Sequence, residues 1–221
     1  MPRAFVTWII AALNVAVFVA AMTGADTLAL GLDSHASPVA LLTYMFSHSD
    51  PIHFIANILL LIVAGRRLEQ AISHISVAII YICGGIAGGL LFVAACKIIG
   101  ADNATLTGAS AATLALCTAL IGSTSNMRRN LLHNRLSVAI IILLILNIVY
   151  GLQGHNPGGD IAHLGGIAVG IIAAVIICRH HPAVDTNALI DKARQSGYAS
   201  LSPDEQRILN HHSLQANAEN K

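Results

Sequence analysis

Charged residues are scarce in this chain, and their scarcity excludes an ordinary soluble fold. Only 10% of the 221 residues are Asp, Glu, Lys or Arg, whereas 55% are hydrophobic, and soluble domains carry about 25% charged residues. The mean hydropathy is high, at +0.70. The composition therefore predicts an all-α polytopic membrane protein in a lipid bilayer, and we expect no nucleic-acid partner.

Metal-binding motifs are missing as well. The 11 histidines raise the question of a zinc site, yet the sequence contains neither an HExxH nor a CxxC pattern. The four cysteines lie in or next to apolar stretches, where we expect no disulfides: Cys83, Cys96, Cys117 and Cys178. We therefore predict no metal site and no cofactor.

Six apolar stretches are candidates to cross a bilayer core of about 30 Å. They cover approximately residues 5–22, 52–65, 75–98, 107–125, 136–151 and 161–178. The second is short, but Arg66 and Arg67 can extend it because their long side chains reach the lipid headgroups. The first has no convincing cleavage site and is interpreted as a retained helix. Residues 1–180 are thus predicted to form a six-helix transmembrane domain.

Residues 181–221 are predicted to be a separate cytoplasmic tail with two short helices. Asp185 or Thr186 can cap the first helix, which would stop at Gly197. Ser202 and Glu205 have the spacing of a capping box for the second helix. The tail could pack on itself, on the membrane surface or on an unknown partner, and the sequence leaves these alternatives open.

The distribution of basic residues predicts the orientation, because cytoplasmic loops are enriched in Lys and Arg. With the N-terminus inside, Lys97 is the only basic residue left outside. The outer loops then carry aspartates instead: Asp26, Asp33, Asp50, Asp102 and Asp160. Six spans with both termini in the cytoplasm is therefore the predicted topology.

In this topology the second, fourth and sixth spans all begin on the outer side. Each opens with unusual residues for a membrane helix: His53 and Asn57, then Gly108 and Ser110, then Asp160 and His163. Polar groups within the bilayer are costly and usually face the protein interior or a wet cavity. Three helices that bring such groups to one depth predict a single site.

Serine and histidine at one site suggest nucleophilic catalysis. Ser110 becomes a nucleophile only if a base takes its proton, and His163 is the candidate base. His53 and Asn57 lie four residues apart and share a helical face. Together with the Ser110 backbone N–H, they are candidates to stabilise an oxyanion.

Small residues line the helices that carry Ser110 and His163. They recur every fourth position, at Ala111, Ala115 and Ala119 and at Ala162, Gly166 and Gly170. Such stripes let helix backbones approach closely in lipid. Generic packing also uses such stripes, but their position beside both candidate residues favours a role in bringing the two together.

Three segments together resemble one known family. The first is LTYMFSHSDPIHFIANILLLIVAGRRLE, which contains His48, His53 and Asn57; the others are GASA at 108–111 and AHLGGIAVG at 162–170. In this order they resemble the rhomboid intramembrane serine proteases of the bacterial type with six transmembrane helices. Ala111, Leu114 and the pair Val39 and Ala40 depart from common family residues.

The resemblance implies a serine endopeptidase with a Ser110 and His163 dyad and no carboxylate third member. His53 and Asn57 would assist at the oxyanion, and Gly108 and His48 would support the site. The implied substrates are transmembrane proteins, cut near the outer end of a spanning segment. The implied location is a bacterial inner membrane, with the site open to the outer side.

Two other functions remain open from the sequence. One is a rhomboid-like pseudoenzyme that binds membrane clients without cleaving them, although the presence of both Ser110 and His163 argues against it. The other is a small transporter, which would favour acidic residues deep in the spans or paired broken helices. The sequence shows neither feature.

Overall fold

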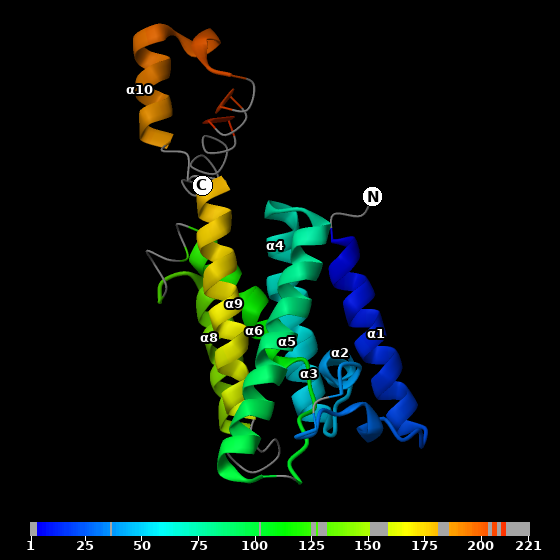
Figure 1. The fold of residues 1–221 in the computed structure, drawn as a ribbon. Coiled ribbons are helices and arrows are strands. Elements are labelled where there is room, and N and C mark those ends of the chain that lie inside the picture. Colours follow the sequence, from blue (N-terminus) through cyan, green and yellow to red (C-terminus); the bar gives the residue numbers. More distant parts are fainter. Residues whose placement is uncertain are drawn as a thin grey trace. The chain divides into compact units, whose positions relative to one another are not determined.

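The computed structural model describes residues 4–35, 37–101, 103–124, 127, 132–150, 159–180, 186–202, 205–206 and 209–210. The chain divides into two compact units, Met1–His180 and His181–Lys221. Within the described residues the first unit is a bundle of helices (Figure 1). The all-α membrane fold predicted from the composition is therefore confirmed.

In the part of the chain that the structure describes, five helices and one helical run build this bundle. They are α1 (Phe5–Met22), the run of α3 (Pro51–Leu60), the π-helical turn η3 (Leu61–Gly65) and α4 (Arg66–Ala71), then α5 (His74–Ile99), α6 (Ser110–Ser123), α8 (Arg135–Tyr150) and α9 (Gly159–His180). Among the described residues, four segments are long and apolar enough to span a membrane: Phe5–Met22, Pro51–Ala71, His74–Ile99 and Gly159–Arg179. Two predicted spans, α6 and α8, form shorter helices.

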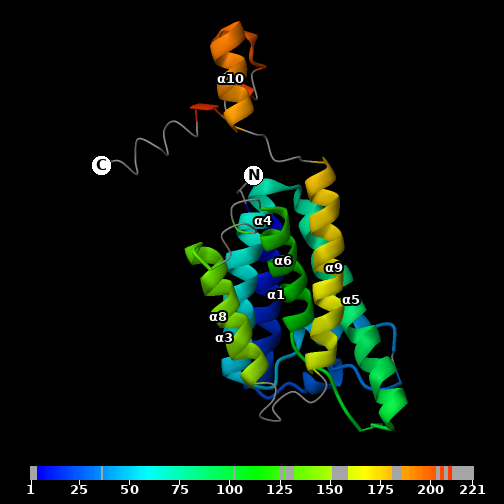
Figure 2. The ribbon, with the colours of Figure 1, turned by 90° about the vertical axis from the view of Figure 1, so that its left-hand side faces the viewer.

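Helix α6 lies in the middle of the bundle. Figure 2 shows it between α8 and α9, with α1 and α5 behind. Nearly all side chains from Ser110 to Leu120 are buried. The helix begins at Ser110 and not at residue 107 as predicted, because Gly108 has a φ of +110° and cannot be helical.

Side chains cap the first turns of α3, α5 and α8, the last through Asn134 Oδ1, which accepts the N–H groups of Leu136 and Ser137. Asp50 precedes α3, and its Oδ1 accepts the N–H groups of Ile52 and His53 at 2.7 and 3.0 Å. Pro51 occupies the first helical position, where a missing N–H costs nothing. Ser73 caps α5 in the same way through the N–H of Ser76. These caps fix where α3 and α5 begin.

Glu69 on α4 caps a different helix, α1. Its carboxylate accepts the backbone N–H groups of Val6 and Thr7 at 2.7 and 2.9 Å, and also the Thr7 hydroxyl. The His74 Nδ1 lies 2.5 Å from Glu69 Oε1, the oxygen that also accepts the Val6 N–H. Four donors thus satisfy one buried carboxylate and join α1, α4 and α5.

The connection from Thr23 to Asp50 folds against the bundle through short helical turns. These are η1 (Leu28–Leu30), α2 (Ala40–Thr43) and η2 (Tyr44–Phe46). Two backbone hydrogen bonds pair Leu32 with Leu106, in the loop before α6. The Tyr44 hydroxyl donates to the Gly85 carbonyl at 2.7 Å. The connection is therefore hydrogen-bonded both to α5 and to the loop that precedes Ser110.

The second unit begins with α10 (Thr186–Ser196), followed by Gly197 at φ +83° and the turn η5 (Tyr198–Ser200). Ser202 and Glu205 form the predicted capping box, with reciprocal backbone-to-side-chain hydrogen bonds. That contact, together with Lys192, lowers the pKa of Glu205. Most of the second predicted tail helix falls outside the described residues.

Candidate active site

The segment before Ser110 requires a glycine. Gly108 has a φ of +110°, and a Cβ there would lie 2.5 Å from Cε1 of His53. Its N–H donates to the carbonyl of Tyr44 at 3.0 Å. Gly108 thereby lets the chain pass directly over the His53 ring and turn into α6, so that Ser110 is its first residue.

His48 holds the same segment from the loop before α3. Its Nε2 accepts the N–H of Ala109 at 3.3 Å, and its Nδ1 lies 3.4 Å from the carbonyl of Phe46. Burial, followed by the charge of His53, lowers the pKa of His48 to about 3. A neutral imidazole with its proton on Nδ1 can make both contacts.

Asn57 and Thr113 connect α3 to α6 beside Ser110. The Thr113 hydroxyl lies 3.0 Å from the Ser110 carbonyl oxygen and 3.3 Å from Asn57 Oδ1. Asn57 Nδ2 donates to the His53 carbonyl at 2.9 Å. One of the two N–H groups of the amide is used in this way, which leaves the other for a ligand. Thr113 was not identified from the sequence, although it is a polar residue one turn after Ser110.

Glycines on α5 and α9 bring the neighbours of Ser110 and His163 together. A Cβ on Gly88 would lie 2.5 Å from Ala111 Cβ and 2.7 Å from the Ala162 carbonyl oxygen. A Cβ on Gly166 would lie 2.0 Å from the Ala111 carbonyl oxygen. Ala111 follows Ser110 and Ala162 precedes His163, so the close packing predicted for these helices is confirmed at this level.

The His163 side chain is buried at the start of α9. Its Nδ1 lies 3.7 Å from Asp160 Oδ1, and it interacts electrostatically with His53 of α3. Among the described residues, neither ring nitrogen of His163 has a hydrogen-bond partner. The ring is thus positioned by packing and charge, with hydrogen-bonding capacity left over.

The predicted site residues share the end of the bundle where α3, α6 and α9 begin (Figures 1 and 2). His48, His53, Asn57, Ser110 and His163 are all at most 5% exposed. Within the part of the chain that the structure describes, no group of three His, Cys, Asp or Glu side chains could hold a metal ion. The arrangement therefore offers a hydroxyl, imidazoles and an amide for chemistry.

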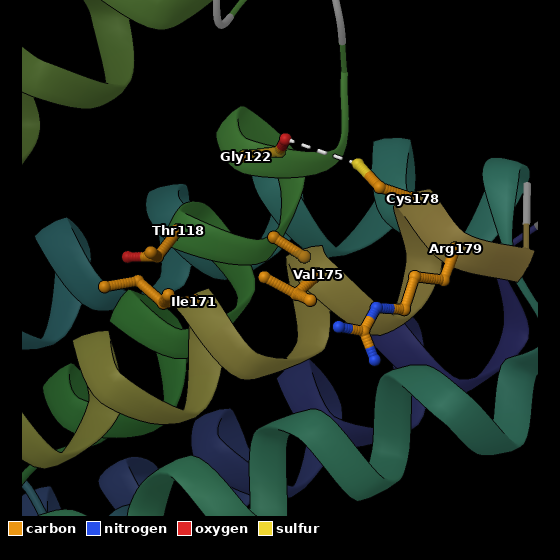
Figure 3. Close-up of a pocket in the computed structure, with 7 residues that line it drawn as sticks. Thr118, Gly122, Ile171, Val175, Cys178 and Arg179 are labelled. Carbon is orange, nitrogen blue, oxygen red and sulfur yellow. Dashed lines mark hydrogen bonds between the residues drawn. The ribbon is translucent and has the colours of Figure 1, made fainter. Parts of the chain in front are cut away.

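A separate cavity of about 420 Å³ lies between the later turns of α6 and α9. Figure 3 shows Ile171 and Val175 along this cavity and Arg179 at one end of it. The Cys178 thiol donates a hydrogen bond to the Gly122 carbonyl. None of the predicted site residues lines this cavity. It belongs to the opposite end of these two helices and is not the candidate site.

The fold and the site define a class: a polytopic helical membrane protein with polar groups buried at one end of its bundle. The comparison with protein families then identifies the family. Residues 35–180 match the Rhomboid domain, and they make up more than half of the chain. The chain belongs to the rhomboid family.

Curated relatives agree with this assignment. RHOMBOID-like protein 7 of Arabidopsis thaliana is 31% identical over 142 residues, which cover 63% of this chain and 43% of the relative. The mitochondrial RHOMBOID-like protein 6 of the same plant is 30% identical over 140 residues, covering 62% and 43%. Rhomboid-related protein 3 of Homo sapiens is 28% identical over 152 residues, covering 63% and 36%. The chain thus matches less than half the length of each of these relatives.

Proposed function

We propose that this chain is an intramembrane serine endopeptidase with Ser110 as nucleophile and His163 as general base. One observation supports the proposal most directly. Ala111 and Ala162, the neighbours of the two residues, meet at Gly88, and α9 has no side chain at Gly166 where it meets Ala111. A serine and a buried histidine on different helices are thereby held at the same level.

The proposed reaction begins with proton transfer from Ser110 Oγ to a ring nitrogen of His163. Ser110 Oγ then bonds to the carbonyl carbon of the substrate peptide, and the carbonyl oxygen becomes an oxyanion. When the C–N bond breaks, His163 returns the proton to the leaving amine. A water molecule, activated by the same imidazole, hydrolyses the acyl ester and restores Ser110.

Three groups are proposed to stabilise the oxyanion. The Ser110 N–H lies in the first turn of α6, where helix N–H groups have no acceptor within the helix. The unused N–H of Asn57 and the ring of His53 complete the set. Each such donor contributes about 3 kcal/mol or more in hydrolases of known mechanism. His48 and Gly108 support this arrangement by holding Ala109 and the His53 ring.

The proposed substrates are membrane proteins with a transmembrane segment. A peptide bond within or beside that segment must reach Ser110, which is the first residue of an apolar helix in a protein that spans the bilayer. The basic residues predict that the termini lie in the cytoplasm and that the site opens outward. A bacterial inner membrane remains the proposed location.

A fluorophosphonate probe tests this proposal, because it reacts covalently with an activated serine. The detergent-solubilised protein is expected to be labelled, and Ser110→Ala and His163→Ala are expected to abolish labelling with helical content intact. Ser123→Ala is a matched control, since Ser123 lies on the same helix and bonds to the Leu120 carbonyl. His133→Ala is a control at an exposed histidine.

Two outcomes would contradict the proposal. Labelling that persists in Ser110→Ala would show that another residue reacts. A folded wild-type protein that is neither labelled nor able to cleave a panel of transmembrane substrates would favour the pseudoenzyme, whose clients would still bind.

A further inference from the structure

Asp160 and His163 face each other across one turn of α9. Asp160 Oδ1 lies 3.7 Å from His163 Nδ1, and residues three apart share a helical face. Both atoms are buried, and neither has a hydrogen-bond partner among the described residues. Buried polar atoms are nearly always hydrogen-bonded. A facing pair that lacks any partner therefore calls for an explanation.

We propose that Asp160 is a positioning residue for His163, which keeps the ring proton on Nδ1 and leaves Nε2 free to face Ser110. The inference rests on the proposed protease function and adds a third member to the dyad. The 3.7 Å separation is longer than a hydrogen bond. Catalytic contacts are often long without substrate and shorten in the reacting complex.

In the proposed attack of Ser110 on the substrate, only one of the two relevant protons moves. The proton of Ser110 Oγ moves to His163 Nε2, while the proton on Nδ1 stays in place and points to Asp160 Oδ1. The imidazolium that forms is stabilised by the carboxylate, which itself remains ionised. The Nε2 proton then passes to the leaving amine. Asp160 touches neither the substrate nor the reacting atoms.

A purely structural role is the alternative explanation for Asp160. It is the second residue of α9, where a negative charge stabilises the start of a helix. That role requires no contact with the ring. The side chain is 41% exposed overall, yet its Oδ1 is buried against Nδ1. The carboxylate therefore has one oxygen toward His163, which the structural role does not explain.

Among the residues that the structure describes, few other charges surround the His163 ring. His53 of α3 interacts with it, and Asp50 in turn interacts with His53. Helix α6 carries no charged side chain, and α5 carries only His74 and Lys97, near its two ends. A change in the pH dependence on removing the Asp160 charge can therefore be assigned to the Asp160 and His163 pair.

The pH–rate profile of Asp160→Asn tests the inference. We expect kcat to fall about tenfold or more with KM nearly unchanged, which is less than the ~10⁴-fold loss at a fully buried triad aspartate, since Asp160 is partly exposed. The acidic limb of the profile should move to lower pH, because the imidazolium has lost its counter-charge. A helix-start role would change thermal stability and leave this limb in place.

Two variants control for general effects. Asp26→Asn removes an equally charged, exposed residue of an outer loop and should leave the profile unchanged. Asp160→Glu restores the carboxylate and should recover activity to within about threefold of wild type. If Asp160→Asn retains kcat within twofold and the limb does not move while the wild type cleaves, the positioning role is wrong and the proposed protease function stands.

The tautomer of His163 provides a second test that does not depend on a variant of Asp160. In ¹⁵N spectra of the histidine-labelled wild-type protein, the signals lost in His163→Ala identify this ring. We expect the neutral ring to carry its proton on Nδ1. A proton on Nε2 would overturn the inference, whether or not the protein proves to be a protease.

Discussion

Two buried polar groups at opposite ends of the bundle differ in how fully they are hydrogen-bonded. At one end, the Glu69 carboxylate receives hydrogen bonds from Val6, Thr7 and His74. At the other end, His163 and Asp160 hold three of the five buried side-chain N and O atoms that lack a partner among the described residues. The Glu69 carboxylate thus has hydrogen-bond donors on both oxygens, whereas Asp160 Oδ1 and the two ring nitrogens of His163 have no hydrogen-bond partner among the described residues.

This difference distinguishes polar groups that hold the fold from groups available for chemistry. A fully bonded network in a low dielectric is rigid and costly to disturb. An unbonded imidazole is equally costly to bury, but it can accept a proton or a ligand without first breaking a bond. Replacing residues of the Glu69 network is therefore expected to affect mainly stability, and replacing residues around His163 mainly the proposed activity.

The largest expected effect on stability is that of Glu69→Ala. It leaves the buried N–H of Thr7 and the half-buried N–H of Val6 without their acceptor, and we expect a loss of about 3 kcal/mol in unfolding free energy. Denaturant unfolding in mixed micelles measures it. Gln70→Ala, at the exposed neighbour, should change little. Equal losses in both variants would mean that the Glu69 network does not stabilise the bundle.

Gly166→Ala should lower the proposed protease activity more than the stability. The new Cβ would lie 2.0 Å from the Ala111 carbonyl oxygen, so α9 must shift away from α6. A displacement of about 1 Å at a catalytic pair lowers the rate about 100-fold. Ala168→Val adds volume on the exposed face of α9 and should keep full activity. Wild-type activity in Gly166→Ala would show that the close approach is not needed.

The smallest expected effect concerns His48 and pH. Its pKa is lowered to about 3 by burial and by His53, so the unfolded chain binds a proton that the folded one does not. The stability that depends on neutral His48 is complete above pH 6.5 and is lost as the pH falls toward 3. At pH 5.5 the stability lost in this way amounts to about 1.4 kcal/mol.

His48→Gln isolates this contribution, because its amide oxygen can still accept the Ala109 N–H. The melting temperature of the variant should decrease less steeply between pH 6.5 and 4 than that of the wild type. Parallel curves for the two proteins would show that His48 is not held neutral in the folded state. Gln206→Ala, in the separate tail unit, should follow the wild-type curve.

The long helices were predictable because apolar length alone determines them. Predicted bounds of 5–22, 75–98 and 161–178 correspond to Phe5–Met22, His74–Ile99 and Gly159–His180. The start of α6 was not predictable, since it depends on the positive φ of Gly108 above the His53 ring. The apolar stretch continues across this point, and only the contact between Gly108 and His53 sets where the helix begins.

The connection between α1 and α3 shows a second limit. Its turns have no regular periodicity, and they are held by distant partners such as Tyr44 with Gly85 and Leu32 with Leu106. The candidate site residues could be proposed from helix ends and motifs. Thr113 was missed because a threonine in an apolar helix usually bonds to its own backbone, whereas this one also faces Asn57.

The Glu69 cap has a consequence for how the chain matures. The carboxylate that α1 needs lies 62 residues after Thr7 in the chain, so α1 cannot receive this cap before α4 has been synthesised. The cap of α1 is therefore completed by tertiary assembly with α4 and not by residues of α1 itself.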